Sequence, residues 1–311
     1  MLLLSEDDVE RLLDLDLLIE SLADAFVELS SGRTSVPPRV AATVPGRGLL
    51  AAMPGYAAGV LETKLVSLFP GNHERAIPSH QALIALFDPE TGSPLAVMAG
   101  TRITATRTAA ASALAVRTLA REDSRVLAVL GAGVQGRSHL EAVPRVLAFD
   151  EVRVASRTRA HAEALARDFD AAAATSFEEA VRGADVVCAC THASDPLIRG
   201  EWLAPGMHVS SVGANFEGPE LDEATVRAGL LVVESRVAFE PPPAGAAELG
   251  GLDPDAAAEL GEILAGARPG RTSPEQITVY KSMGHAVEDA AAAGLVYRRA
   301  LEAGAGVEVA L

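Results

Sequence analysis

Short apolar runs alternate with helical segments from Arg125 to about Ser282. The runs are almost continuously apolar, which is typical of strands buried on both faces of a parallel sheet. The alternation predicts a doubly wound α/β sheet, in which Pro144 ends or kinks the first helix and 221–228 forms a later one. The predicted strands are Val126–Leu130, Val152–Ser156, Asp185–Thr191, His208–Gly213, Leu230–Ser235 and Ile277–Ser282.

The pattern before residue 100 differs, because strand-like stretches follow one another and are joined by Pro and Gly turns. An amphipathic helix from Ser5 to Leu29 precedes them, with a capping-box spacing between Ser5 and Asp8. The stretches are Val40–Val44, Leu49–Met53, Gly59–Phe69, His80–Asp88 and Leu95–Met98.

Two further helices, Ile103–Leu119 and His285–Leu301, stand on either side of the α/β segment. We expect the second to return to the N-terminal domain, which makes that domain discontinuous. The predicted organisation is a first domain of residues 1–118, a Rossmann-type domain of residues 119–284, and a C-terminal helix, 285–311, that packs on the first domain. The fold class is therefore α/β, a doubly wound parallel sheet plus a discontinuous α+β domain.

The strand Val126–Leu130 leads into the sequence Gly131-Ala-Gly133-Val134-Gln135-Gly136. In a dinucleotide site the three glycines permit a sharp turn, close approach of a pyrophosphate to the backbone, and tight packing of the next helix. The N–H groups and dipole at the start of that helix attract the anion. A glycine-rich turn of this spacing also occurs by chance, but the strand before it and the helix and strand after it favour cofactor binding.

The end of the second strand, Ser156-Arg157-Thr158, contains no acidic residue that would bind a ribose 2′-hydroxyl and repel a 2′-phosphate. Hydroxyls and a guanidinium are phosphate ligands. We therefore expect NADPH to be preferred and NADH to be possible. The alternative is that Arg157 and Arg159 only solvate the start of a helix.

The composition and charge of the chain argue against some classes of function. The chain has 311 residues, 49% of them hydrophobic and 4% aromatic, and a formal charge of −16, which argues against a nucleic-acid or anionic-membrane surface. An anionic substrate must then be attracted by a local group of cations. Cys188 and Cys190 show neither a disulfide framework nor a metal-type spacing, and the start of the chain lacks the basic segment of a secretion signal. We expect a cytoplasmic protein with no membrane span and no metal.

Arg39, Lys64 and Arg107 are each embedded among apolar or small residues. A buried cation needs a carboxylate partner, which is either the protein's own or a ligand's. Each one alone is most simply explained as a structural ion pair, but the three together beside a nicotinamide site favour a carboxylate clamp. This interpretation fails if the chain's own acids neutralise the three side chains.

Several motifs resemble the ornithine cyclodeaminase and μ-crystallin family, which includes alanine dehydrogenases and ketimine reductases, over nearly the whole chain. They are Met53-Pro54, Lys64–Val66, Leu86–Pro94, Arg107–Ala110, Gly131–Gln135, Ser210–Gly213, Glu220–Asp222 and Ile277–Ser282.

The resemblance implies a homodimer formed by the N-terminal domain, with substrate held between the domains. It places Arg39, Lys64 and Arg107 at the positions that hold the substrate carboxylate. The positions that contact the cofactor correspond to Ser79, Thr108, Val134, Gln135, Ser156 and Ser211.

One residue departs from the family pattern. The cyclodeaminases carry a catalytic aspartate after the segment that matches Val212-Gly213, whereas Asn215 stands at that position here. An amide is no base near neutral pH, although it can hydrogen-bond an amino or imino nitrogen. Asn215 could equally be a turn residue. Glu217, Glu220 and Asp222 are candidates to replace the base, but the family pattern does not support them. Glu220 and Asp222 are more simply the start of the next helix.

The leading hypothesis is an NAD(P)-dependent reductase of a small α-imino acid or cyclic ketimine, or a dehydrogenase of the matching α-amino acid. Arg39, Lys64 and Arg107 would hold the carboxylate, and Lys64 and Asn215 would act on the reacting group. One alternative is an ornithine cyclodeaminase, which forms proline and ammonia. A second is a binding protein that holds NADPH or another small ligand without turnover.

Overall fold

The computed structural model describes residues 1–75, 77–213, 218–242 and 244–310. They divide into two compact units: unit 1 is Met1–Arg107 with Ala286–Leu311, and unit 2 is Thr108–His285. The division falls inside α3, Thr101–Leu119, so that Arg107 and Thr108 belong to different units.

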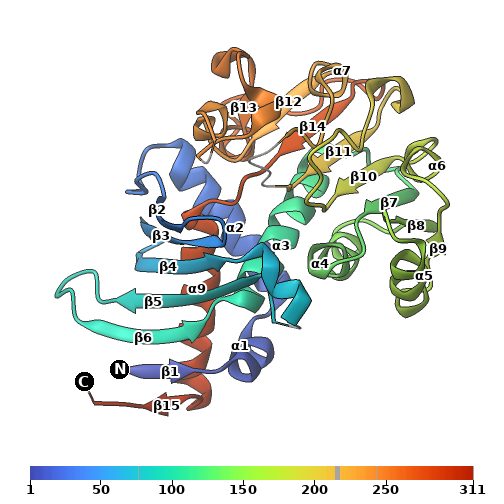
Figure 1. Cartoon of the computed structure of the whole chain (residues 1–311). Coiled ribbons are helices and arrows are strands. Elements are labelled where there is room, and N and C mark those ends of the chain that lie inside the picture. Colours follow the sequence, from blue (N-terminus) through green and yellow to red (C-terminus); the bar gives the residue numbers. More distant parts are fainter. Residues whose placement is uncertain (76, 214–217, 243, 311) are drawn as a thin grey trace. The chain divides into compact units, whose positions relative to one another are not determined.

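Unit 1 contains a mixed sheet of seven described strands in the order β15-β1-β6-β5-β4-β3-β2 (Figure 1). Most neighbours are antiparallel, whereas β1 and β6 are parallel. The chain ends meet at one edge, where β1 pairs with β15. The strands are β1 Leu2–Leu4, β2 Val40–Val44, β3 Gly48–Ala57, β4 Val60–Leu68, β5 His80–Phe87, β6 Pro94–Ala99 and β15 Val307–Glu308.

Three helices accompany this sheet, α1 (Glu6–Leu12), α2 (Leu15–Ser30) and α9 (Ala286–Ala303). A short 3₁₀ turn, η1, spans Pro70–Arg75. Helix α9 packs on β3, β4 and β5 and also contacts α2, so the C-terminal segment contributes to the interior of unit 1.

The single N-terminal helix predicted from Ser5 to Leu29 is wrong, because the chain forms two helices. Ser5 and Asp8 make the predicted capping box of α1. Leu13 is then extended, and the Asp14 side chain accepts from the Leu17 amide to start α2. Asp14 is a second N-cap after Ser5, and it divides an otherwise continuous apolar stripe into two helices.

Strand β3 extends beyond its predicted end at Met53, through Pro54 to Ala57. Proline cannot donate to a ladder, which is why the sequence pattern ended there. The strand continues because β2 begins only at Val40, opposite Ala52. The Pro54 nitrogen is therefore not required as a donor to β2, while Pro54 pairs with Thr63 on β4.

Unit 2 contains eight described strands in the order β13-β12-β14-β11-β10-β7-β8-β9, and every pair is parallel. The predicted doubly wound parallel sheet is confirmed. The strands are β7 Val126–Leu130, β8 Glu151–Ala155, β9 Ala172–Ala173, β10 Val186–Ala189, β11 His208–Ser211, β12 Leu230–Val233, β13 Ala258–Glu259 and β14 Thr278–Lys281.

The helices of unit 2 connect these strands, and α4, α5 and α6 pack against β7, β8 and β9. As predicted, α4 ends before Pro144, which lies in the 3₁₀ turn η2. The predicted helix 221–228 is shorter and begins after Asp222, which caps it. The helices are α4 Val134–Ala142, α5 Arg159–Asp168, α6 Phe177–Val181, α7 Glu223–Val226 and α8 Leu260–Leu264, with 3₁₀ turns η2 Val143–Arg145, η3 Gly200–Trp202, η4 Arg236–Phe239, η5 Ala247–Leu249 and η6 Pro254–Ala256.

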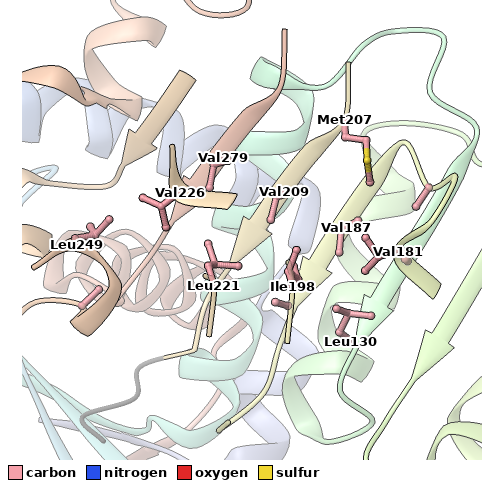
Figure 2. Packing of buried hydrophobic residues seen from close by; sticks show 14 of the residues in the cluster. Leu130, Val181, Val187, Ile198, Met207, Val209, Leu221, Val226, Leu249 and Val279 are labelled. Carbon is pink, nitrogen blue, oxygen red and sulfur yellow. The ribbon is translucent and has the colours of Figure 1, made fainter. Parts of the chain in front are cut away.

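A continuous apolar core supports the unit 2 sheet (Figure 2). Val187, Val209 and Val279 project from neighbouring strands, and Ile198 and Leu221 come from the connections that follow. This core fixes the positions of β7 and β10, between which the strand order reverses. Ligands of open α/β sheets bind at the carboxyl ends of strands where the order reverses, which locates the candidate site of unit 2.

Candidate functional site

Gly131 follows β7 directly and forms the sharp turn that the sequence predicts. Its φ is +118°, a conformation that L side chains rarely adopt. A Cβ here would lie 2.6 Å from the carbonyl oxygen of Cys190, at the end of β10. Only glycine therefore lets the chain leave β7 beside β10.

The other two glycines of the loop have different surroundings. A Cβ on Gly136 would lie 2.0 Å from the Gly131 carbonyl oxygen, so this glycine lets α4 pack directly on the turn. A Cβ on Gly133 would meet nothing within 4 Å. Gly133 thus presents bare backbone to open space, as the close approach of a pyrophosphate requires.

The start of α4 is built to receive an anion. Gly133 is its N-cap and supplies no side-chain hydrogen bond, so the first N–H groups of the helix have no side-chain cap. Val134, the first helical residue, is 69% exposed. The Gln135 side-chain oxygen is buried without a hydrogen-bond partner among the described residues. A bare backbone, an uncapped helix of nine residues and an orphaned amide oxygen fit a dinucleotide.

The end of β8 presents the expected polar residues. Ser156 is half-buried, and Arg157 and Thr158 are exposed. Thr158 is the N-cap of α5 without a side-chain capping bond. Arg159, by contrast, pairs with Glu163 at 2.7 Å within α5. Of the two arginines, Arg159 therefore has the structural role considered for both.

His139 holds the first turn of α4 in place through a directed chain of hydrogen bonds. Its Nδ1 lies 2.7 Å from the Gln135 carbonyl oxygen, which can only accept, so Nδ1 donates and Nε2 is unprotonated. Nε2 then accepts from the Ser112 hydroxyl at 2.9 Å, and Ser210 on β11 donates to Ser112 at 3.0 Å. Burial lowers the pKa of His139 to about 4, which keeps this tautomer neutral.

No role was predicted for His139 from the sequence. The available signal was its position four residues after Gln135 on one helix, but its partners Ser112 and Ser210 are distant in sequence.

Ser211, predicted to contact the cofactor, has its hydroxyl in a buried hydrogen-bond network. The hydroxyl donates to Glu220 at 2.7 Å and accepts from Lys281 Nζ at 3.1 Å. The Glu220 carboxylate also accepts from the Thr191 hydroxyl at 2.7 Å and the Gly213 amide at 2.9 Å. Lys281 donates to the Gly213 carbonyl at 2.7 Å and pairs with Glu248 at 2.9 Å.

The prediction that Glu220 starts the next helix is wrong, because its carboxylate is fully buried and accepts from loops after β10 and β11. The same prediction for Asp222 is correct, since its side chain accepts from the Thr225 amide and caps α7. Both acids therefore have structural partners. Asn215 and Glu217 lie outside the described residues.

In unit 1, Lys64 and Arg107 are buried and do have carboxylate partners of their own. Lys64 Nζ lies 2.7 Å from Asp289. Arg107 lies 2.9 Å from Glu288 and 3.1 Å from Asp289, and both acids are on α9. Of the two kinds of partner predicted for a buried cation, Lys64 and Arg107 have the protein's own carboxylates, so their charge alone is no evidence for a substrate carboxylate.

Burial and ion pairing together shift the pKa values of Lys64 and Asp289. Burial lowers the pKa of Lys64, and Asp289 opposes that shift. Burial raises the pKa of Asp289, but Lys64 and Arg107 outweigh it and hold this pKa below its usual value. Asp289 is therefore ionised. These two acids were missed by the sequence analysis, although adjacent acids in an alanine-rich helix were a visible signal.

The remaining predicted residues are Arg39 and Ser79 of unit 1 and Thr108 of unit 2. Arg39 is half-buried directly before β2, and Ser79 is half-buried directly before β5, where its carbonyl accepts from the Phe69 amide. Thr108 is buried and begins the part of α3 that belongs to unit 2.

The described residues include no candidate membrane span and no candidate metal centre. None of their helices combines the length and the apolarity that crossing a bilayer requires. No group of three or more His, Cys, Asp or Glu side chains among them could hold a metal ion.

A parallel sheet whose order reverses beside β7, with three glycines leading to an uncapped helix, defines a Rossmann-type dinucleotide-binding protein. The chain belongs to the ornithine cyclodeaminase/mu-crystallin family, whose model matches residues 1–304. The predicted family is confirmed.

Individual relatives are similar over nearly their full length. The ketimine reductase mu-crystallin of Mus musculus is 44% identical over 302 residues, covering 94% of this chain and 95% of the relative. The Thermococcus litoralis Δ1-pyrroline-2-carboxylate reductase, solved with NADH and L-proline, has a TM-score of 0.92 and 39% identity, covering 99% of this chain and 100% of that one. An archaeal alanine dehydrogenase dimer with bound NAD has a TM-score of 0.90 and 32% identity, covering 100% and 99%.

The glycine loop yields a test that separates packing from cofactor binding. Gly136→Ala forces a Cβ onto the Gly131 carbonyl, so we expect a loss of about 4 kcal/mol in the free energy of unfolding or failure to fold. Gly133→Ala adds a methyl only to open space, so we expect near-native stability and about tenfold weaker NADPH binding. Thermal unfolding and nucleotide fluorescence titration measure the two effects. Native NADPH affinity in Gly133→Ala would contradict this assignment.

Proposed function

We propose that this protein is an NAD(P)-dependent oxidoreductase that reduces a small α-imino acid or cyclic ketimine to the matching amino acid. The observation that carries the proposal is a complete three-glycine turn and uncapped helix in a chain 44% identical to a ketimine reductase. The likeness to the pyrroline-2-carboxylate reductase, a protein solved with NADH and L-proline, supports a cyclic imino acid as substrate.

Within this proposal, unit 1 binds the substrate and unit 2 binds the nucleotide. Arg39, Lys64 and Arg107 hold the substrate carboxylate, and their fixed positions aim the imine carbon. Lys64 and Arg107 can serve although they are paired, because an ammonium has three donors and a guanidinium has five. The ion pairs with α9 orient both head groups in advance.

The reaction adds a hydride to the imine carbon and a proton to the nitrogen. The nicotinamide group, when bound, supplies the hydride. Gly131, Gly133 and Gly136 shape its site, Val134 and Gln135 present the first N–H groups of α4, and the Ser112–His139 chain holds that turn. Asn215 hydrogen-bonds the substrate nitrogen, and Lys64 polarises the substrate or supplies the proton.

Ornithine cyclodeamination is the alternative within the family, and it requires a base. Asn215 cannot serve as one. Glu220 is enclosed by four hydrogen bonds and Asp222 caps α7, so neither is placed to take a substrate proton. These partners favour net imine reduction. A binding protein without turnover is the remaining alternative, and the oriented pairs Lys64–Asp289 and Arg107–Glu288 argue against it because nucleotide binding does not need them.

The preferred cofactor is NADPH. Arg157 and Thr158 are exposed after β8, in the position where an acid would favour NADH, and Ser156 lies beside them. NADH remains a usable cofactor, as the bound NADH of the pyrroline-2-carboxylate reductase suggests.

The protein assembles as a homodimer through the sheet of unit 1. Val40, Ala52, Leu65 and Leu83 are directly paired across β2, β3, β4 and β5. The three larger side chains are 65%, 39% and 53% exposed, in the order Val40, Leu65 and Leu83. An exposed apolar row of this kind marks a protein interface, and an alanine dehydrogenase of this fold is a dimer. The cytoplasm is the proposed compartment, in keeping with the two buried free thiols Cys188 and Cys190.

The reaction is tested with Δ1-pyrroline-2-carboxylate and with ornithine. We expect stoichiometric oxidation of NADPH and formation of proline from the imino acid, followed by nicotinamide absorbance and amino-acid analysis. Ornithine should give no ammonia. Proline from ornithine without net NADPH consumption would establish the cyclodeaminase instead, and tight NADPH binding with no turnover of imines or amino acids would establish a binding protein.

The cofactor preference is tested with a pair of neighbouring arginines. Arg157→Ala should raise the KM for NADPH about tenfold and leave the KM for NADH nearly unchanged, because one charge-assisted bond to the 2′-phosphate is lost. Arg159→Ala is the matched control, since Arg159 is exposed and pairs with Glu163, and it should alter neither constant. Equal effects of Arg157→Ala on both cofactors would remove the argument for NADPH.

The dimer is tested by placing a charge in the apolar row. Leu65→Lys should convert the dimer into a monomer in light scattering, because an unpaired ammonium cannot be buried at the interface. Leu301→Lys is the control, since Leu301 is 60% exposed at the end of α9 and lies outside the row. A dimeric Leu65→Lys variant would show that the row is not the interface.

A further inference from the structure

A third carboxyl belongs to the buried charges of unit 1. Glu62 lies two residues before Lys64 on β4, so the two side chains share one face of the strand. Glu62 is 2% exposed, as is Lys64, and Arg107 is 4% exposed. Glu288 and Asp289 are fully buried on α9, which packs against β4.

Glu62 takes part in none of the ion pairs that the described residues of this cluster form. Asp289 serves Lys64 and Arg107, and Glu288 serves Arg107. Both Glu62 oxygens are buried without a hydrogen-bond partner among the described residues. Within this cluster, two cations face two paired carboxylates and one unpaired carboxyl, so the charges balance only if Glu62 is neutral.

The neighbours of Glu62 offer it no counter-charge of its own. Its strand partners are Gly55 on β3 and the buried Leu86 on β5. A Cβ on Gly55 would lie 3.3 Å from a Glu62 oxygen, so the backbone of β3 lies close to the carboxyl on that side. An ionised carboxylate in this position would be desolvated and repelled by Asp289, and the attraction of Lys64 and Arg107 offsets this only in part.

We propose that Glu62 holds a proton in the enzyme and thereby sets the net charge beneath Lys64 and Arg107, which determines how tightly the protein binds an anionic substrate. With Glu62 protonated, the cluster of five groups is neutral and its cations can receive a carboxylate. With Glu62 ionised, the cluster carries one negative charge, which repels the substrate carboxylate. Glu62 acts through Lys64 and Arg107 and is thus a positioning residue.

The direction of the pH dependence follows from the surroundings. Burial raises the pKa of Glu62 to about 9 from 4.5, and the charge of Asp289 adds to this shift, while Lys64 and Arg107 oppose it. Glu62 is therefore neutral at physiological pH and loses its proton as the pH rises through about 9. Affinity for an anion should fall over the same range, and an anion bound there should bring a proton with it.

The binding test rests on the proposed function, because it assumes that the cations of unit 1 receive a carboxylate. The probe is pyrrole-2-carboxylate, a cyclic anion that cannot be reduced as an imine and whose charge is constant in this pH range. Calorimetry of the full-length protein with NADPH, in buffers of different ionisation enthalpy, measures its Kd and the protons taken up.

We expect wild type to bind the probe about tenfold more weakly at about pH 10 than at about pH 7, with uptake of about one proton at the higher pH. Glu62→Gln mimics the neutral acid, so its Kd should change little with pH and its binding should take up few protons. Glu90→Gln is the matched control, because Glu90 is exposed in the turn after β5, and it should behave as wild type. With Δ1-pyrroline-2-carboxylate, the same difference should appear in KM and not in kcat.

A stability measurement tests the proton on Glu62 without any ligand. A carboxyl whose pKa is raised on folding binds its proton more tightly in the folded state, so its contribution to stability is lost as the pH rises toward the folded pKa. Between about pH 6 and about pH 8.5 the Tm of Glu62→Gln should fall less steeply than the Tm of wild type or Glu90→Gln.

The outcomes separate the two proposals. If wild type fails to bind pyrrole-2-carboxylate at about pH 7, the carboxylate site of the proposed function is wrong, and the role of Glu62 in affinity fails with it. If wild type and Glu62→Gln bind with the same pH profile and the same proton uptake, the role of Glu62 is wrong and the carboxylate site stands. Parallel Tm profiles would show that Glu62 carries no proton.

Discussion

The pairing of buried charges in unit 1 is the constraint on which the rest of that unit depends. Lys64 and Arg107 are withdrawn from water, and such cations persist in a folded protein only beside carboxylates. Asp289 and Glu288 provide these from α9, a helix formed by the opposite end of the chain. The return of α9 to the N-terminal sheet is therefore an electrostatic requirement as well as apolar packing, and it leaves the cationic groups oriented.

Unit 2 depends on close approach of backbone to backbone. The turn at Gly131 comes so near the end of β10, and α4 so near that turn, that a Cβ at either glycine would overlap a carbonyl oxygen. Gly131 and Gly136 are crowded, whereas Gly133 faces open space. Together they leave backbone N–H groups exposed at the place where the strand order reverses. The hydrogen bonds from Ser210 through Ser112 and His139 to Gln135 connect this surface to the centre of the sheet.

The two units also suggest why imine reduction suits this chain better than cyclodeamination. Among the described residues, the acids closest in sequence to Asn215 are committed to structure, Glu220 to the loops after β10 and β11 and Asp222 to the start of α7. A reduction needs a held carboxylate, an aimed carbon and one proton, and it needs no strong base. The chain supplies the groups for the simpler reaction.

Local features of the sequence were sufficient for the parallel sheet, the capping box at Ser5 and the glycine turn, since each depends on residues adjacent along the chain. The division of the N-terminal helix at Asp14, the passage of β3 through Pro54 and the burial of Glu220 were decided by partners that the pattern did not reveal. Lys64 and Arg107 were recognisable as buried, but their charge balance was not, because Asp289 and Glu288 are far from them in sequence. Burial and spacing are local properties that a sequence records, whereas electrostatic neutrality is a property of the folded interior and exists only once its distant parts have met.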